Sequence, residues 1–236
     1  MFESPVSAGI IKLVSFDHIR SAVQLAGLAH QEELIFNSHN EEGTSFYSHK
    51  AYVTGSIMLC VAFIEARINE LIVGATINVN PWNKGIVDEN TYKSFQQAGI
   101  LDGINNLRLL EKYQFVLSFF GKQQFKKEKP PYQDVSLLIS LRNKLVHFKP
   151  EIQWLNDEHY FLKHFKSKKL SLNPIVEKSK SSEFPDILLG YGCAKWAIMS
   201  SLKFVTDFDA RLKLYSNYMD LEKECKGLLL RKQKDT

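Results

Sequence analysis

Apolar side chains recur along the chain at spacings of three, four and seven residues, the pattern of helices with one buried face. The clearest case lies between residues 50 and 75, where Val53, Ile57, Ile64 and Leu71 share one face. This is also the most apolar segment, so we expect it to form the central helix. The same spacing predicts further helices over residues 17–35, 88–97, 104–120, 134–148 and 186–214.

Few residues interrupt these predicted helices. Only 12 Gly and 7 Pro occur in 236 residues, which is too few for a many-turned β-sandwich and is typical of long helices with few connections. No Pro-, Gly- or Ser-rich break divides the chain near its middle, so we expect one domain over residues 1–236. The prediction is an all-α fold, a bundle of four to six helices.

Two segments lack clean helical periodicity. Residues 151–185 are predicted to form a long, irregular, basic connection before the last helix, and long connections are often functional. Residues 218–236 are predicted to form a basic C-terminal tail. In the last helix the side chains expected to be buried are Trp196, Met199, Leu202 and Phe204.

The composition narrows the class of protein. With 44% apolar and 24% charged residues, the chain resembles globular proteins and not disordered or fibrous ones. Cys60, Cys193 and Cys225 form no CxxC pair, which argues against a disulfide framework or a zinc knuckle and favours a reducing cytoplasm. The N-terminus lacks a signal pattern, and the longest apolar run, residues 57–64, is far shorter than the roughly 20 residues that cross a bilayer. We therefore expect a cytoplasmic protein with no membrane partner.

The net charge of +4 is unevenly distributed. Residues 163–180 contain six basic residues and one acid, residues 122–129 contain four Lys and one Glu, and residues 223–234 contain five basic residues and one Glu. Such clusters are compatible with a polyanionic partner. The alternative is that they are solvated loops without a binding role.

The most informative stretch is LISLRNKLVHFKPE, residues 138–151. On a helix, Asn143 and His147 lie about 40° apart, and Arg142 flanks the same face at about 140° from His147. The expected core face consists of Leu138, Leu141, Leu145 and Phe148. The polar side chains are therefore free to line a surface groove.

This combination suits phosphoryl chemistry without a metal or another cofactor. An imidazole can exchange the proton of a ribose 2′-hydroxyl, and the Arg142 guanidinium can stabilise charge on the phosphorus oxygens. RNA carries that hydroxyl and DNA does not. The alternative is structural: Arg142 pairs with an acid, and His147 ends the helix, where a cationic His is favourable.

Other catalytic signatures are missing from the sequence. It contains no glycine-rich phosphate loop, no GxSxG and no paired-carboxylate signature, which argues against the common NTPases and hydrolases. The pairs His159 with His164 and His30 with Glu33 each lack a third ligand, so we predict no metal site.

The pattern Arg142-Asn143-x3-His147 resembles the HEPN superfamily of helical nucleases, whose motif is an Arg, four to six residues and then a His, often with a polar residue directly after the Arg. The match covers about 40 residues in two helices. Here Lys149 occupies the position two residues after the His, where some relatives carry a Tyr that a partner enzyme modifies. The resemblance implies a four- or five-helix bundle that dimerises, so that the motifs of two protomers form a metal-independent endoribonuclease site.

The resemblance also implies a biological setting and a supporting residue. The setting is a toxin, antiphage defence or RNA processing, with a cognate antitoxin or inhibitor protein as a further partner. Glu65, on the central helix, is the candidate that faces the motif and pairs with Arg142. The alternatives are that Glu65 contacts Asn69 or that Glu70 pairs with Arg67.

RNA contacts are expected from basic residues near the motif and in the connection. Tyr160 and Phe161 lie beside basic residues there and are candidates for stacking on bases, as is Trp154. Other members of the superfamily lack nuclease activity, so a non-catalytic dimeric adaptor that binds RNA or a partner protein is the second hypothesis. The predicted RNA-binding residues are Lys144, Lys149, Lys163, Lys166, Lys168 and Lys169.

Overall fold

The computed structural model describes residues 12–39, 46–76, 103–104, 106–149, 160–168, 170–178, 184–214, 218 and 221. These residues contain α-helices and one short 3₁₀ helix, with no strand among them, so the all-α prediction is confirmed for this part of the chain. The described α-helices number seven, more than the four to six predicted. They are α1 Ser15–His39, α2 Phe46–Thr76, α5 Leu109–Phe119, α6 Tyr132–Val146, α7 Tyr160–Ser167, α8 Pro174–Lys178 and α9 Tyr191–Leu212, with η1 Asp186–Leu188 between α8 and α9.

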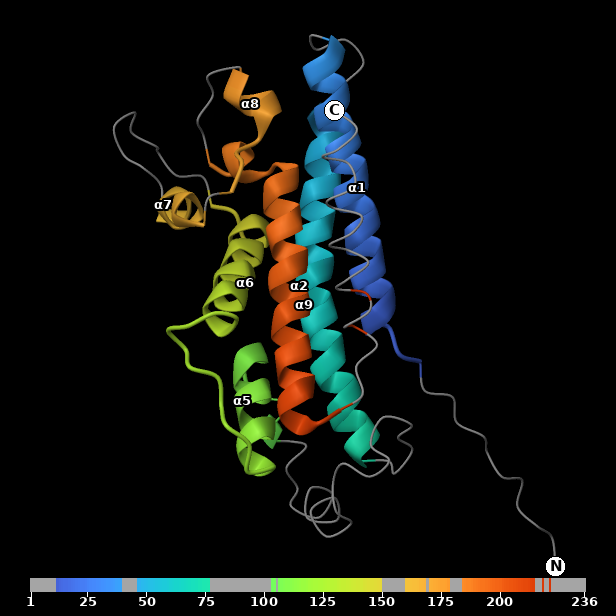
Figure 1. Cartoon of the computed structure of the whole chain (residues 1–236), viewed down its shortest axis with the longest axis vertical. Helices are drawn as coiled ribbons and strands as arrows, with labels where there is room; N and C mark the ends of the chain where they lie inside the picture. The colour runs from blue at the N-terminus through green and yellow to red at the C-terminus, as the bar shows by residue number, and fades with distance from the viewer. Residues whose placement is uncertain are drawn as a thin grey trace, which may run out of the picture.

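Three long helices form the centre of the bundle. Figure 1 shows α2 and α9 side by side along the length of the bundle. α1 lies on one side of this pair, and α5 and α6 lie end to end on the other side. Ala22, Ala26 and Ala29 are fully buried on the face of α1 that meets α2. Their small side chains let the two helices approach closely, and the Ser56 hydroxyl of α2 donates to the Ala22 carbonyl at 2.9 Å. The apolar segment over residues 50–75 is therefore central, as predicted.

The N-terminus of α1 is capped by a residue from another helix. Glu70 of α2 accepts hydrogen bonds from the backbone N–H groups of Val14 and Ser15, at 2.7 and 2.8 Å, and from the Ser15 hydroxyl at 2.6 Å. The helix consequently begins at Ser15, two residues before the predicted start at Asp17. An acceptor from 55 residues away satisfies its first donors.

Several predicted boundaries differ from the structure. The helix expected over residues 104–120 begins only at Leu109, because Glu111 accepts the Arg108 N–H at 2.9 Å and starts the helix there. The helix expected over 186–214 is interrupted at Leu189 and Gly190, which separate η1 from α9. Of the four side chains expected to be buried in it, Trp196, Leu202 and Phe204 are buried and Met199 is partly buried. The helix expected over 88–97 lies outside the described residues.

The connection over residues 151–185 is not irregular throughout, and that prediction was wrong for its described part. It contains α7 and α8, and α7 buries Phe161 and Phe165. The Phe165 ring meets Trp196 of α9 edge-on at 4.8 Å, and Phe161 stacks on Phe184 at 5.5 Å. Two aromatic anchors therefore fix α7 to the bundle.

The predicted C-terminal tail also contacts the core where it is described. Tyr218 and Leu221 are both buried, and the Tyr218 hydroxyl lies 2.6 Å from Ser15 Oγ. In the described part of the chain, no helix is both long and apolar enough to cross a membrane.

Gly192, in the first turn of α9, packs against Ser171. A methyl group at Gly192 would lie 2.3 Å from Ser171 Oγ and 2.9 Å from the Ser171 carbonyl oxygen. We expect Gly192→Ala to lower the free energy of unfolding by about 1–3 kcal/mol, the usual cost of overpacking, as measured by urea denaturation.

Gly27 in α1 provides the matched control, because a methyl group there has nothing within 4 Å. Gly27→Ala is expected to raise the free energy of unfolding by up to about 1 kcal/mol, since alanine favours a helix interior. Equal stability of the two variants would contradict the close packing of Gly192 on Ser171.

Candidate functional site

The motif lies at the C-terminal end of α6, which packs against α2 and α9. Leu138 and Leu141 are buried on its inner face, as predicted. The helix ends at Val146, two residues before the predicted end, and His147 is its C-cap. The His147 N–H still donates to the Asn143 carbonyl at 2.9 Å, so the two residues remain one turn apart.

The three motif side chains face water to different degrees. Arg142 is half-buried, while Asn143 and His147 are exposed. None of the three side chains makes a hydrogen bond or ion pair with another described residue. An ion pair between Arg142 and an acid, the structural alternative, is therefore not formed within the described residues, although His147 does end the helix.

Glu65 does not pair with Arg142 in the structure. It is exposed on α2 and makes no ion pair or hydrogen bond with any other described side chain. The two alternatives are not formed among the described residues either. The Asn69 side chain accepts a hydrogen bond from Lys112 and makes none with Glu65, while Arg67 pairs with Asp209 and Glu70 caps α1. An exposed carboxylate needs no partner, so the apolar neighbours of Glu65 in sequence were a misleading signal.

Two apolar side chains flank His147 in water. Phe148 was predicted to belong to the core face, and it is 47% exposed, because α6 ends before it and turns the backbone away. Val146 is 52% exposed, and Leu145 is only partly buried against the core. The end of α6 thus presents an imidazole between two hydrocarbon groups.

The predicted RNA-binding lysines fall into different environments. Lys149, Lys163 and Lys166 are exposed, and Lys144 is half-buried. Lys168 forms an ion pair with Asp134 of α6, so part of its charge is neutralised. Lys169 lies outside the described residues.

The outer face of α7 combines an aromatic ring with basic groups. Tyr160 is 60% exposed, and its ring centroid lies 4.1 Å from that of His164. Phe161, the other stacking candidate in this helix, is buried and contributes to packing instead. Trp154 and His159 lie outside the described residues.

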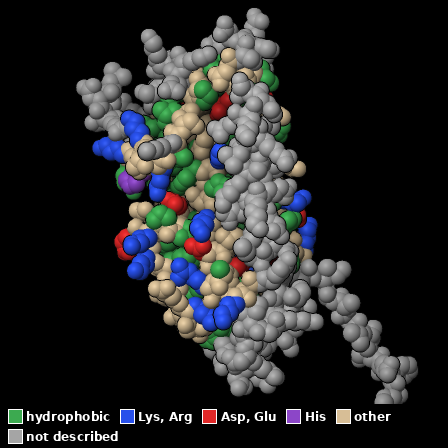
Figure 2. All heavy atoms as spheres, in the orientation of Figure 1, with side chains coloured by type: hydrophobic (Ala, Val, Ile, Leu, Met, Phe, Trp, Pro, Cys, Tyr) green, Lys and Arg blue, Asp and Glu red, His purple; other side chains and the backbone are tan. Residues whose placement is uncertain are grey.

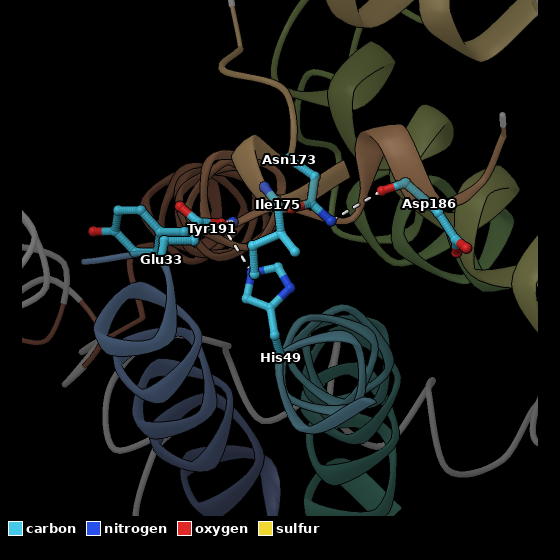
Figure 3. A network of polar contacts seen from close by, with 6 residues as sticks. All are labelled: Glu33, His49, Asn173, Ile175, Asp186 and Tyr191. Atoms are coloured by element: carbon cyan, nitrogen blue, oxygen red, sulfur yellow. Dashed lines mark hydrogen bonds and ion pairs between the residues drawn. The ribbon is translucent and has the colours of Figure 1, made fainter. Parts of the chain in front are cut away.

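A second polar cluster, which the sequence analysis did not predict, joins α1, α2 and the start of α9 (Figure 3). Glu33 accepts hydrogen bonds from the Tyr191 N–H at 2.6 Å and from His49 Nε2 at 2.9 Å. His49 is fully buried, and its Nδ1 has no partner among the described residues.

This cluster holds helices together. Asn173 accepts the Ile175 N–H and donates to the Asp186 carbonyl, each at 3.1 Å, which ties η1 to the start of α8. Burial and the nearby Glu33 carboxylate raise the pKa of Tyr191 to about 12, so its phenol stays protonated. The buried groups therefore serve as caps and interhelical hydrogen bonds.

We also searched the described residues for a reactive thiol and for a cluster of metal ligands. Cys60 and Cys193 are buried, and burial raises the pKa of the Cys193 thiol to about 12, far from the thiolate that would attack a substrate. Across the described ranges, no three His, Cys, Asp or Glu side chains are grouped so that they could hold a metal ion. Comparisons with family models, with curated proteins and with solved structures find no match.

Proposed function

We propose that this protein is a metal-independent endoribonuclease whose site is the end of α6. The observation that carries the proposal is the state of Arg142, Asn143 and His147. Their side chains reach the surface at one helix end and have no hydrogen-bond or ion-pair partner among the described residues. A guanidinium and an imidazole left in this way are available to a phosphodiester.

The proposed reaction is attack of the ribose 2′-oxygen on the adjacent phosphorus. His147 accepts the 2′-hydroxyl proton, the new P–O2′ bond forms and the P–O5′ bond breaks. The leaving 5′-oxygen takes a proton from the His147 imidazolium of a second copy. Arg142 stabilises the negative charge on the phosphorus oxygens, and Asn143 positions the phosphate. The products carry 2′,3′-cyclic phosphate and 5′-hydroxyl ends.

The second imidazole requires a homodimer, which the resemblance to the HEPN superfamily implies. The exposed Val146 and Phe148 support this part of the proposal, because two apolar side chains beside His147 suit a contact between copies. In a two-fold dimer the same patch meets itself, which brings the two motifs together. A toxin, defence or RNA-processing role in the cytoplasm, with an antitoxin or inhibitor protein, belongs to the same proposal.

Incubation of purified protein with total cellular RNA in EDTA tests the activity. We expect fragments whose 5′ ends accept phosphate from a polynucleotide kinase without prior dephosphorylation, since they carry 5′-hydroxyl groups. An absence of fragments at every protein concentration would contradict the nuclease. Salt-sensitive RNA binding without cleavage would favour the second candidate, an adaptor, for which the exposed Lys163 and Tyr160 of α7 provide a surface.

A further inference from the structure

The loop between α5 and α6 is held in place by a side-chain clamp. The Gln114 amide accepts the Phe125 N–H and donates to the Phe125 carbonyl, both at 2.9 Å. The Phe125 ring is buried and stacks on Phe204 of α9 at 4.7 Å. Gly121 has a φ of +61°, which a residue with a Cβ adopts at a cost, and begins the loop.

Arg211 of α9 fixes the same loop from the other side. Its guanidinium lies over the Phe125 ring, 4.3 Å from the centroid, and donates to the Gln123 carbonyl at 2.7 Å. Main chain and ring are thus held by two helices. A loop fixed in this way loses little conformational freedom when it binds a ligand.

This fixed loop displays four lysines. All four are exposed, and none forms an ion pair with a described residue, although Glu128 lies among them. Figure 2 shows Lys and Arg side chains spread over the side of the molecule where α5 and α6 lie in Figure 1. The lysines are Lys122, Lys126, Lys127 and Lys129.

A pocket opens where the loop meets α6 and α9. Its volume is about 370 Å³, within the range of small-ligand sites. Pro130, Pro131 and Met199 supply apolar walls, and Ser200 supplies a hydroxyl. Ser200 is 7% exposed, and its side chain makes no hydrogen bond with another described residue.

The charged side chains around the pocket are already neutralised. Asp134 pairs with Lys168, and Lys203 pairs with Asp207 at 2.8 Å. The pocket therefore suits an uncharged group with a flat apolar body and a polar edge. Just outside the pocket is Lys129, the residue before Pro130, whose charge has no ion-pair partner among the described residues.

We propose that the pocket binds one base of an RNA strand and that the loop lysines bind the phosphates next to that base. An uncharged heterocycle beside an anionic phosphate is the arrangement within every nucleotide. This inference rests on the proposed function for its ligand, RNA, and assigns that strand a second contact point. Asp134 and His147 lie at opposite ends of α6, about 20 Å apart at 1.5 Å per residue. That separation corresponds to about six nucleotides of a stacked strand.

Binding of non-cleavable oligonucleotides to the full chain tests the pocket without requiring catalysis. The probes are a fluorescent 2′-O-methyl RNA twelve-mer and an abasic twelve-mer of the same backbone and charge, read by anisotropy. The unmodified protein should bind the base-bearing probe at least about fivefold more tightly, since one stacked base contributes about 1–3 kcal/mol. Ser200→Leu, which fills the pocket, should lower that ratio at least threefold. Ser200→Ala removes only the hydroxyl and should lower it less, which keeps the test decisive if the larger side chain prevents folding.

Single charge reversals test the loop. Lys129→Glu should weaken the binding of both probes. It should also make the slope of the logarithm of the binding constant against the logarithm of the salt concentration less steep, by about 0.7. Lys12→Glu is the matched control, because Lys12 is exposed and comes shortly before α1, the helix on the side of the bundle opposite to α5 and α6 (Figure 1). This variant should leave the binding of both probes and its salt dependence unchanged.

Three results would overturn the inference. The first is that both Ser200 variants still prefer the base-bearing probe as strongly as the unmodified protein does. The second is that Lys129→Glu and Lys12→Glu bind the probes equally well. The third is that a poly-glutamate peptide of the same charge binds as tightly as the base-bearing probe. The outcome is separate from that of the proposed function. If the protein binds RNA in a base-dependent way but cleaves none, the proposed nuclease activity is wrong and the proposed base pocket stands. If the protein cleaves RNA but its binding does not depend on the bases, the nuclease activity stands and the base pocket is wrong.

Discussion

His147→Ala is expected to lower the rate of RNA cleavage in EDTA by a factor of about 100 to 10,000, the usual contribution of a general acid or base. The melting temperature should not change, because the His147 side chain is exposed and contacts no described partner. Initial rates of fragment formation on a defined RNA, combined with thermal unfolding of the same samples, measure both quantities.

Two variants on the same helix serve as comparisons. Arg142→Lys keeps the positive charge but loses the planar set of donors, so we expect a large fall in rate without loss of RNA binding. Ser140→Ala changes an exposed residue whose hydroxyl donates to the Ser136 carbonyl of the same helix at 2.9 Å, and this variant should cleave as fast as the parent. Unchanged cleavage by His147→Ala would exclude the imidazole from the reaction.

Asp209→Ala is expected to lower the free energy of unfolding by about 3–5 kcal/mol, the cost of removing one partner of a buried ion pair. Its carboxylate lies 2.8 Å from Arg67 Nη2, and the two side chains are 0% and 4% exposed. Burial lowers the pKa of the Arg67 guanidinium, but Asp209, together with Tyr218 and Tyr113, more than offsets this and holds that pKa above its usual value. Without Asp209 a buried cation would lose its main partner, as urea denaturation should detect.

Asp207, two residues earlier in α9, provides a control of the same residue type. It pairs with Lys203 at 2.8 Å, but the two side chains are 30% and 58% exposed, so Asp207→Ala should cost less than about 1 kcal/mol. The double variant Arg67→Met with Asp209→Leu should recover most of the lost stability, since neither charge of this pair then remains buried. If Asp209→Ala lowers the free energy of unfolding as little as Asp207→Ala does, the buried ion pair adds little to stability.

The long helices were predictable because their apolar spacing repeats over many turns. α2 and α6 were expected within a few residues of their true ends. α7 was missed because it has only eight residues, although its buried anchors Phe161 and Phe165 keep the helical spacing of four.

Parts of the candidate site followed from the sequence, and others could not. The spacing of Asn143 and His147 on a helix predicted their exposure, because the leucines opposite them are buried. The partner of Arg67 could not be predicted, because Asp209 lies 142 residues away and the pairing depends on how α2 and α9 pack. The pocket beside Ser200 likewise exists only where a loop and two helices meet.

The hydrogen bond from the Tyr191 N–H to Glu33 spans 158 residues of sequence. It supplies an acceptor at the first turn of α9, where helices leave several donors unsatisfied. That turn cannot fray on its own without exposing further a carboxylate that is now only 12% exposed. Opening at either end of this contact is thus coupled to opening at the other, so the first and last long helices are expected to exchange their amide hydrogens as one cooperative unit.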